Sequence, residues 1–186
     1  MPVETIKVSD NVVIEIHQDE DAESPANWDN LGEITYKGHG RHVLGTEAVD
    51  DDRFTEISRK IQTGQYIGIP VYAYVHGQAT IKAAYENPFG CPWDSGWSGW
   101  VYTTREKALQ EYGGKRITKS IREKVYSVLR AEVETFDQYL RGEVYGWVLK
   151  VDGEQVDSCW SYYGVDAAKS DALSEAQRFV EPAELA

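Results

Sequence analysis

A stretch of 23 residues, 118–140, carries the apolar spacing of a long amphipathic helix. Its apolar side chains recur every three or four residues, at Ile121, Val125, Leu129, Val133, Phe136 and Leu140. This spacing places them on one side of an α-helix. Thr118 is a good N-terminal cap and Gly142 a good stop. At 1.5 Å per residue such a helix spans about 35 Å, so we expect it to form the centre of the fold.

Shorter segments on both sides of this helix carry the signals of strands and turns. Runs rich in β-branched and aromatic residues predict strands at 12–16, 33–36, 67–76, 79–85 and 99–102. The segments 144–151 and 155–162 are predicted to form a hairpin, because the Asp152-Gly153 pair between them favours a tight turn. Pro70 has no backbone N–H, so we expect the strand 67–76 to lie at a sheet edge or to begin after the proline.

Shorter helices are predicted at 53–62, from Thr103 or Thr104 to Gly113, and at 166–180. Strands joined mainly by hairpin turns, together with these helices, predict an α+β fold: an antiparallel sheet with one long central helix and two or three shorter helices. A length of 186 residues fits one domain or one domain with a small appendage. We expect an acidic N-terminal strand and loop at residues 1–26, a single α+β domain at 27–180 and a frayed tail at 181–186.

The net charge of −12 is unevenly distributed along the chain. Residues 1–52 carry a net charge of −10, residues 53–130 one of +6, and residues 131–186 one of −8. Two interpretations are open. The acidic and basic regions neutralise one another or are simply solvated, or the acidic regions face a basic partner.

The second interpretation has a specific form. Ordered carboxylates can copy the phosphate charge pattern of a nucleic acid and so occupy a basic groove on a protein. The residues that would build such a surface are Asp19, Glu20, Asp21, Glu23, Asp50, Asp51 and Asp52, together with Asp10 and Glu15.

The chain has no signal of a membrane or of secretion. No apolar run approaches the roughly 18 to 20 residues of a membrane span, and the N-terminus has no basic region followed by an apolar one. We therefore expect a cytoplasmic protein. In a reducing compartment Cys91 and Cys159 are expected to be small buried residues rather than a disulfide.

The run Phe89–Trp100 holds three tryptophans, three glycines and a proline in twelve residues. Tryptophan is a large rigid anchor, and glycine is used where the backbone bends or approaches another group closely. The run therefore builds either a shaped surface or an unusual corner of the core. If it is a surface, the binding candidates are Trp93, Trp97 and Trp100, because tryptophan is enriched at interface hot spots.

Several short segments resemble a family of small phage and mobile-element proteins. The matching segments lie between about residues 27 and 164 and are Asn27–Gly32, Phe89–Gly96, Trp100–Tyr102, Glu132–Leu140, Gly142–Gly146 and Asp157–Trp160. The Cys91-Pro92-Trp93-Asp94-Ser95-Gly96 element is the most specific of them. The family's function is uncharacterised, so it supplies no catalytic residues, and the acidic first 25 residues depart from its pattern. The resemblance implies a phage or prophage accessory protein, a class that includes inhibitors of host defence.

Three aspartates in or beside glycine-bearing turns, Asp29, Asp94 and Asp157, are candidate metal ligands or an acid/base pair if the fold brings them together. The alternative is that each caps its own turn by accepting backbone hydrogen bonds. Zinc ligands are less well supported, because neither cysteine has a second cysteine two to four residues away. The candidates for such a mixed set are Cys91, Cys159, His39, His42 and His76.

Two further kinds of site were weighed. A cysteine nucleophile would pair Cys91 or Cys159 with His76, at a spacing that matches no local signature. A nucleic-acid site would use the basic residues around the start of the long helix, near Trp97, Trp100, Tyr102 and Tyr112. These residues are Arg105, Lys107, Lys115, Arg116, Lys119, Arg122, Lys124 and Arg130. The acidic net charge argues against direct nucleic-acid binding.

Together these observations predict a non-catalytic phage or mobile-element accessory protein without a cofactor. It is expected to bind a host protein and to act as an inhibitor of an antiphage defence complex, of the anti-CRISPR or antirestriction type, through an acidic surface with aromatic anchors. The alternative is a metal-dependent or acid/base enzyme that uses Asp29, Asp94 and Asp157.

Overall fold

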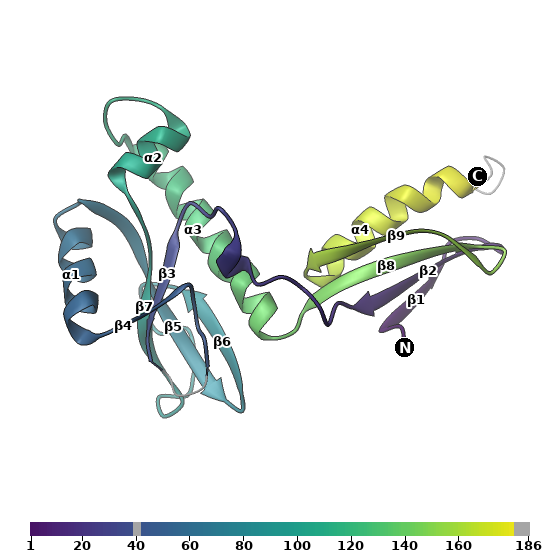
Figure 1. The fold of residues 1–186 in the computed structure, drawn as a ribbon, viewed down its shortest axis with the longest axis horizontal. Coiled ribbons are helices and arrows are strands. Elements are labelled where there is room, and N and C mark those ends of the chain that lie inside the picture. The colour runs from purple at the N-terminus through teal and green to yellow at the C-terminus, as the bar shows by residue number, and fades with distance from the viewer. Residues whose placement is uncertain (39–41, 181–186) are drawn as a thin grey trace. The chain divides into compact units, whose positions relative to one another are not determined.

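The computed structural model describes residues 1–38 and 42–180 (Figure 1). The predicted α+β class is confirmed: the described residues form four α-helices and two mostly antiparallel sheets, and the longest helix has 22 residues. The chain forms two compact units, Met1–Glu23 with Gly142–Ala186, and Ser24–Arg141. This division differs from the predicted 1–26 and 27–180, because the N-terminal strands pair with a strand after residue 142. His39, Gly40, Arg41 and the predicted tail 181–186 lie outside the described residues.

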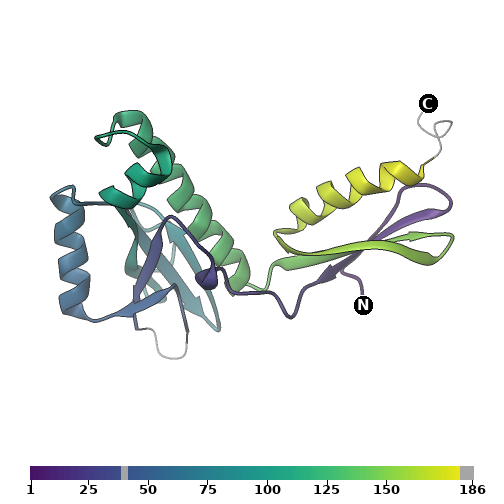
Figure 2. The same cartoon turned by 45° about the horizontal axis from the view of Figure 1, so that its top comes forward.

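The first unit is a four-stranded antiparallel sheet with one helix on it. Its strand order is β1 (Glu4–Lys7), β2 (Val12–Gln18), β8 (Val144–Val151) and β9 (Glu154–Tyr163). Alternation along β2 buries Val12, Ile14 and Ile16 completely. These residues pack with Trp147, Leu149, Ala168, Ala172 and Ala176. α4 (Val165–Ala176), followed by a short 3₁₀ turn, supplies the alanines and lies along one face of the sheet (Figure 2).

The second unit contains a five-stranded sheet. Its order is β4 (Glu47–Val49), β3 (Glu33–Lys37), β7 (Ser95–Thr104), β5 (Tyr66–His76) and β6 (Gln78–Ala83). The pair β3–β4 is parallel and the other pairs are antiparallel. A one-turn 3₁₀ helix, η1 (Pro25–Asn27), precedes β3.

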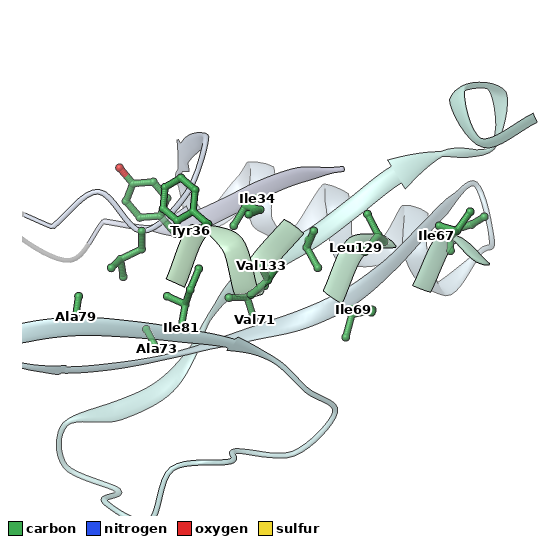
Figure 3. Close-up of a cluster of buried hydrophobic side chains, with 14 of the residues drawn as sticks. Ile34, Tyr36, Ile67, Ile69, Val71, Ala73, Ala79, Ile81, Leu129 and Val133 are labelled. Atoms are coloured by element: carbon green, nitrogen blue, oxygen red, sulfur yellow. The ribbon is translucent and has the colours of Figure 1, made fainter. Parts of the chain in front are cut away.

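The long helix α3 (Lys119–Leu140) covers one face of this sheet, as its apolar spacing predicts. Thr118 caps it by accepting a hydrogen bond from the Ile121 N–H, and Thr104 caps α2 (Arg105–Tyr112) in the same way. Figure 3 shows Leu129 and Val133 of α3 among the sheet side chains Ile34, Ile67, Ile69 and Val71. None of the helices in the described ranges is long and apolar enough to cross a membrane.

The opposite face of the sheet is partly covered by α1 (Asp51–Gln62). Asp50 caps this helix, because its side chain accepts a hydrogen bond from the Arg53 N–H. Phe54 and Ile57 of α1 pack against Trp100 and Tyr102 of β7. Trp97, farther along β7, contacts α1 through Phe54, with the two ring centres 4.8 Å apart.

The expected edge position of the strand 67–76 is wrong. β5 begins at Tyr66 and lies between β7 and β6, so Pro70 is inside the sheet. The Pro70 carbonyl accepts a hydrogen bond from the Ala84 N–H, one residue beyond the end of β6. Because the N and C=O of a strand residue point to the same side, the missing N–H of Pro70 faces a place where β6 has already ended. The proline therefore removes no hydrogen bond between these two strands.

Candidate functional site

The tryptophan-rich run contributes both to the core and to the surface. Ser95–Trp100 belongs to β7 rather than to a loop. Trp100 is 8% exposed, and its indole N–H donates to Ser58 Oγ at 2.9 Å. Trp97 is 44% exposed and packs edge-on against Phe54 and Trp100. Trp93 is 93% exposed. Of the three tryptophans, Trp93 is therefore the one held almost entirely in solvent.

A group of aromatic side chains begins beside α1, where Trp97 contacts Phe54, and continues along the same face of the sheet. Val71 and Ala73 of β5 point toward the α3 side, so Tyr72 and Tyr74 point to the opposite side. Tyr72 pairs with Trp97 across the strands, and the rings of Tyr74 and Phe89 are 5.8 Å apart. We define the aromatic surface as Tyr72, Tyr74, Phe89 and Trp97 together with Trp93, which lies on the same loop as Phe89, one residue before Asp94, whose carbonyl accepts a hydrogen bond from the Val75 N–H.

Hydrogen bonds within the loop before β7 hold it in one conformation. The Ser95 hydroxyl donates to the Cys91 carbonyl at 2.5 Å, and the Asn87 amide donates to Ser95 Oγ at 3.0 Å. Asn87 Oδ1 also accepts a hydrogen bond from the Phe89 N–H. A loop fixed before binding loses less conformational entropy when it meets a partner. Trp93 is thus presented on an ordered support.

The structure brings His76, Cys91 and Asp94 together at the edge of the aromatic surface. His76 Nδ1 is 3.2 Å from Asp94 Oδ2, and the Cys91 thiol donates to the same oxygen at 3.5 Å. A cysteine nucleophile needs its base within hydrogen-bond reach of the sulfur. Here the carboxylate, not the imidazole, is the hydrogen-bond partner of the thiol. The other cysteine, Cys159, lies on β9 in the first unit. It is exposed and Cys91 is half-buried, so the expectation that both cysteines are buried is wrong.

The three aspartates proposed as metal ligands are divided between the two units. Asp157 is on β9 of the first unit, whereas Asp29 and Asp94 are in the second. Asp29 lines a groove beside Glu132, and Asp94 contacts His76. Within residues 1–38 and 42–180, no group of three or more His, Cys, Asp or Glu side chains is arranged to hold a metal ion. His39 falls outside these ranges.

Some of the acidic residues predicted to bind a partner instead use their carboxylates in hydrogen bonds or ion pairs within the fold. Asp19 Oδ2 accepts hydrogen bonds from both the N–H and the hydroxyl of Ser161, where the backbone has a positive φ of 67°. Asp51 pairs with Lys37 at 2.7 Å, and this contact lowers the pKa of Asp51. With Asp50 capping α1, the remaining exposed acidic candidates are Glu20, Asp21, Glu23 and Asp52.

The charge of the chain is divided between the two units. The first unit carries 16 acidic and 4 basic residues, so it holds the whole net charge of −12. The second unit carries 15 acidic and 15 basic residues. Counting along the sequence did not find this division, because the first unit is assembled from both ends of the chain.

The predicted site residues do not include one half-buried carboxylate, Glu132, which joins two of the segments that carry the family resemblance. Glu132 of α3 accepts hydrogen bonds from the Leu31 N–H at 2.7 Å and the Gly32 N–H at 2.9 Å. Burial raises the pKa of Glu132, and the two backbone donors oppose that shift. The signal that could have found it is its position three residues after Leu129, beside the apolar stripe of the helix.

Comparisons of the chain with protein-family models, curated proteins and solved structures found no match.

Proposed function

We propose that this chain is a non-catalytic binding protein that anchors a partner protein on its aromatic surface. The observation that carries the proposal is Trp93, which is 93% exposed on a loop held by internal hydrogen bonds. A large apolar side chain left in water is costly unless it is buried in a complex, and tryptophan is enriched among hot-spot residues. Tyr72, Tyr74, Phe89 and Trp97 extend the same surface.

The first unit supplies the electrostatic part of the proposal. Its net charge of −12 attracts a basic partner and raises the association rate at low salt. The exposed carboxylates Glu20, Asp21 and Glu23 belong to this unit. Binding is therefore expected to weaken as the ionic strength rises.

The class of partner rests on the resemblance to phage and mobile-element proteins. We propose a host protein in the bacterial or archaeal cytoplasm, belonging to a nucleic-acid-binding defence complex. Such complexes expose basic grooves for nucleic acid. An acidic protein that occupies the groove would act as an inhibitor of the anti-CRISPR or antirestriction type.

The test is an affinity pull-down of the tagged full chain from nuclease-treated lysate of a host-like bacterium, read by mass spectrometry. We expect one stoichiometric partner, which Trp93→Ala loses while its unfolding transition is unchanged. Phe179→Ala, which truncates an exposed aromatic side chain of the first unit, is the matched control and is expected to retain the partner. Undiminished capture by Trp93→Ala would refute the aromatic anchor, and a partner-free result would refute the binding function.

A further inference from the structure

The edge strand of the second unit borders an open groove. β6 is the last strand of the five-stranded sheet, and α3 runs beside it (Figure 1). The groove between them has a volume of about 370 Å³. It is lined by Ile81, Lys82, Ala83, Arg130, Val133, Glu134, Asp137 and Arg141.

We propose that this groove binds an extended acidic segment of a protein, which adds to β6 as a further strand. The inference goes beyond the aromatic surface and does not depend on it. Exposed edge strands offer unpaired backbone groups to a peptide, which forms main-chain hydrogen bonds with them and places its side chains alternately on either side.

The register of β6 identifies the backbone groups on the open side. Ala84 donates to Pro70 of β5, so the alternate residues Lys82 and Thr80 also face β5. Ile81 and Ala83 therefore face outward. Asp137 confirms this direction, because its Oδ1 accepts the Ile81 N–H at 2.8 Å from the α3 side.

Along the outer edge of β6, the backbone N–H of Ile81 is already hydrogen-bonded, whereas the backbone groups of Ala83 are open. Asp137 occupies the Ile81 donor, and it also binds the Thr80 hydroxyl and pairs with Arg141. Two residues farther along, the described part of the chain supplies no hydrogen-bond partner for the outward N–H and C=O of Ala83. β6 has a regular register with β5, so this outward edge is not distorted by a bulge. A peptide strand would therefore pair first with Ala83.

The charge around the open end favours an acidic occupant. Asp137 is already paired with Arg141, which leaves Arg130 against Glu134 in the groove, while the Lys82 ammonium at its rim lies 5.7 Å from the centre of the Phe89 ring. Arg122 and Arg130 lie near the hydroxyl of Tyr85, a residue 60% exposed just beyond β6. Arg130 also lies 5.9 Å from the ring centre of Tyr126. Carboxylates on an added strand would meet these cations.

Two other occupants fit less well. A second copy of this chain, paired through its own β6, would bring Lys82 and Arg130 toward like charges. A single-stranded nucleic acid could use the cations and tyrosines, but it has no regular array of donors and acceptors to match the backbone of Ala83. Both become outcomes of the test.

The test uses the full chain and a library of nine-residue peptides with Asp or Glu at alternate positions. The control library carries Lys or Arg at those positions. We expect binders from the acidic library only, and we expect them to protect the Ala83 amide from hydrogen exchange. Methylation of a peptide's backbone nitrogen removes that hydrogen-bond donor. In a bound strand only every second N–H faces β6, so methylating the even-numbered or the odd-numbered residues, but not both sets, should weaken binding about tenfold or more.

Two matched pairs of variants localise the contact. Arg130→Glu should weaken peptide binding about tenfold or more, whereas Lys124→Glu on α3 outside the groove lining should change it less than about twofold. Ala83→Pro removes the outward N–H without touching the ladder to β5 and should also weaken peptide binding. The proposal is overturned by equal binding of the basic library, by no binder in the acidic one, by insensitivity to methylation, or by dimerisation through β6. Preference for a single-stranded oligonucleotide that is unaffected by Ala83→Pro would also overturn it.

Discussion

The carboxylate of Glu132 binds the backbone N–H of Gly32 at 2.9 Å, across 100 residues of sequence. Gly32 packs closely against α3, because a Cβ at this position would lie 2.4 Å from Leu129 Cδ2 and 2.7 Å from Glu132 Oε2, so these side-chain ends would have to shift. The helix α3 and the turn before β3 are thus joined by a close contact at glycine and by hydrogen bonds to a carboxylate.

This contact predicts the effect of Glu132→Gln. The carboxylate accepts from two backbone donors, but a glutamine offers one oxygen and turns an NH₂ group toward the second donor. We expect a loss of about 1–3 kcal/mol in the free energy of unfolding, measured by urea denaturation. The exposed neighbour Glu134→Gln should change stability by less than about 0.5 kcal/mol. Equal stability of the two variants would contradict this role of Glu132.

The tryptophans should separate into stabilising and binding residues. Trp100→Ala removes a buried side chain and its hydrogen bond to Ser58, so it should cost about 3–5 kcal/mol. Trp93→Ala should change the free energy of unfolding by less than about 0.5 kcal/mol, because Trp93 is 93% exposed. Denaturant unfolding of both variants tests this order. A large destabilisation by Trp93→Ala would mean that the loop belongs to the core.

Asp137 is predicted to stabilise the outer edge of β6 and to protect it from association with other chains. It is 5% exposed and accepts hydrogen bonds from Ile81 and Thr80 while it pairs with Arg141. Asp137→Ala leaves a sheet donor without its partner, and we expect a loss of about 1–3 kcal/mol. The newly opened edge should also increase association at high concentration, measured by light scattering. Glu134→Ala, one turn earlier and exposed, is the control.

Glu15 predicts a pH dependence of stability. The hydrogen bond from Lys150, at 2.7 Å, lowers the pKa of Glu15 below its ordinary value of 4.5. Because the folded pKa is the lower one, this contribution is present above about pH 4.5 and is lost as the pH falls through the folded pKa. Glu15→Gln should therefore reduce stability at pH 7 and have a smaller effect at pH 3. Lys150→Met should likewise reduce stability at pH 7 more than at pH 3, because it removes the same ion pair. If both variants changed the free energy of unfolding equally at the two pH values, the pairing of Glu15 with Lys150 would be contradicted.

The local structure of several elements could be predicted from neighbouring residues. The apolar repeat from Ile121 to Leu140 places α3 within one residue of its observed start, and Thr118 caps it as expected. The Asp152-Gly153 turn does join β8 to β9. These features depend on side-chain spacing, capping and turn geometry, which act over a few residues.

The pairing of distant segments could not be predicted in this way. β2 pairs with β8, more than 120 residues later, so both ends of the chain form one acidic unit. The missing donor of Pro70 predicts an edge strand, but its position inside the sheet depends on where β6 ends, which the residues around Pro70 do not indicate. The three tryptophans differ in exposure because α1 covers Trp100 and leaves Trp93 in solvent.

The sequence by itself determined the α+β class, the long helix with its cap, the hairpin turns and the total charge. Tertiary structure alone decided which carboxylates became structural, as for Glu132 and Asp137, and which aromatic side chains remained exposed. The physical reason is that helix and turn signals are short-range. Burial, strand order and the partner of a carboxylate depend on which remote surfaces pack together, and one sequence read in order does not contain that information.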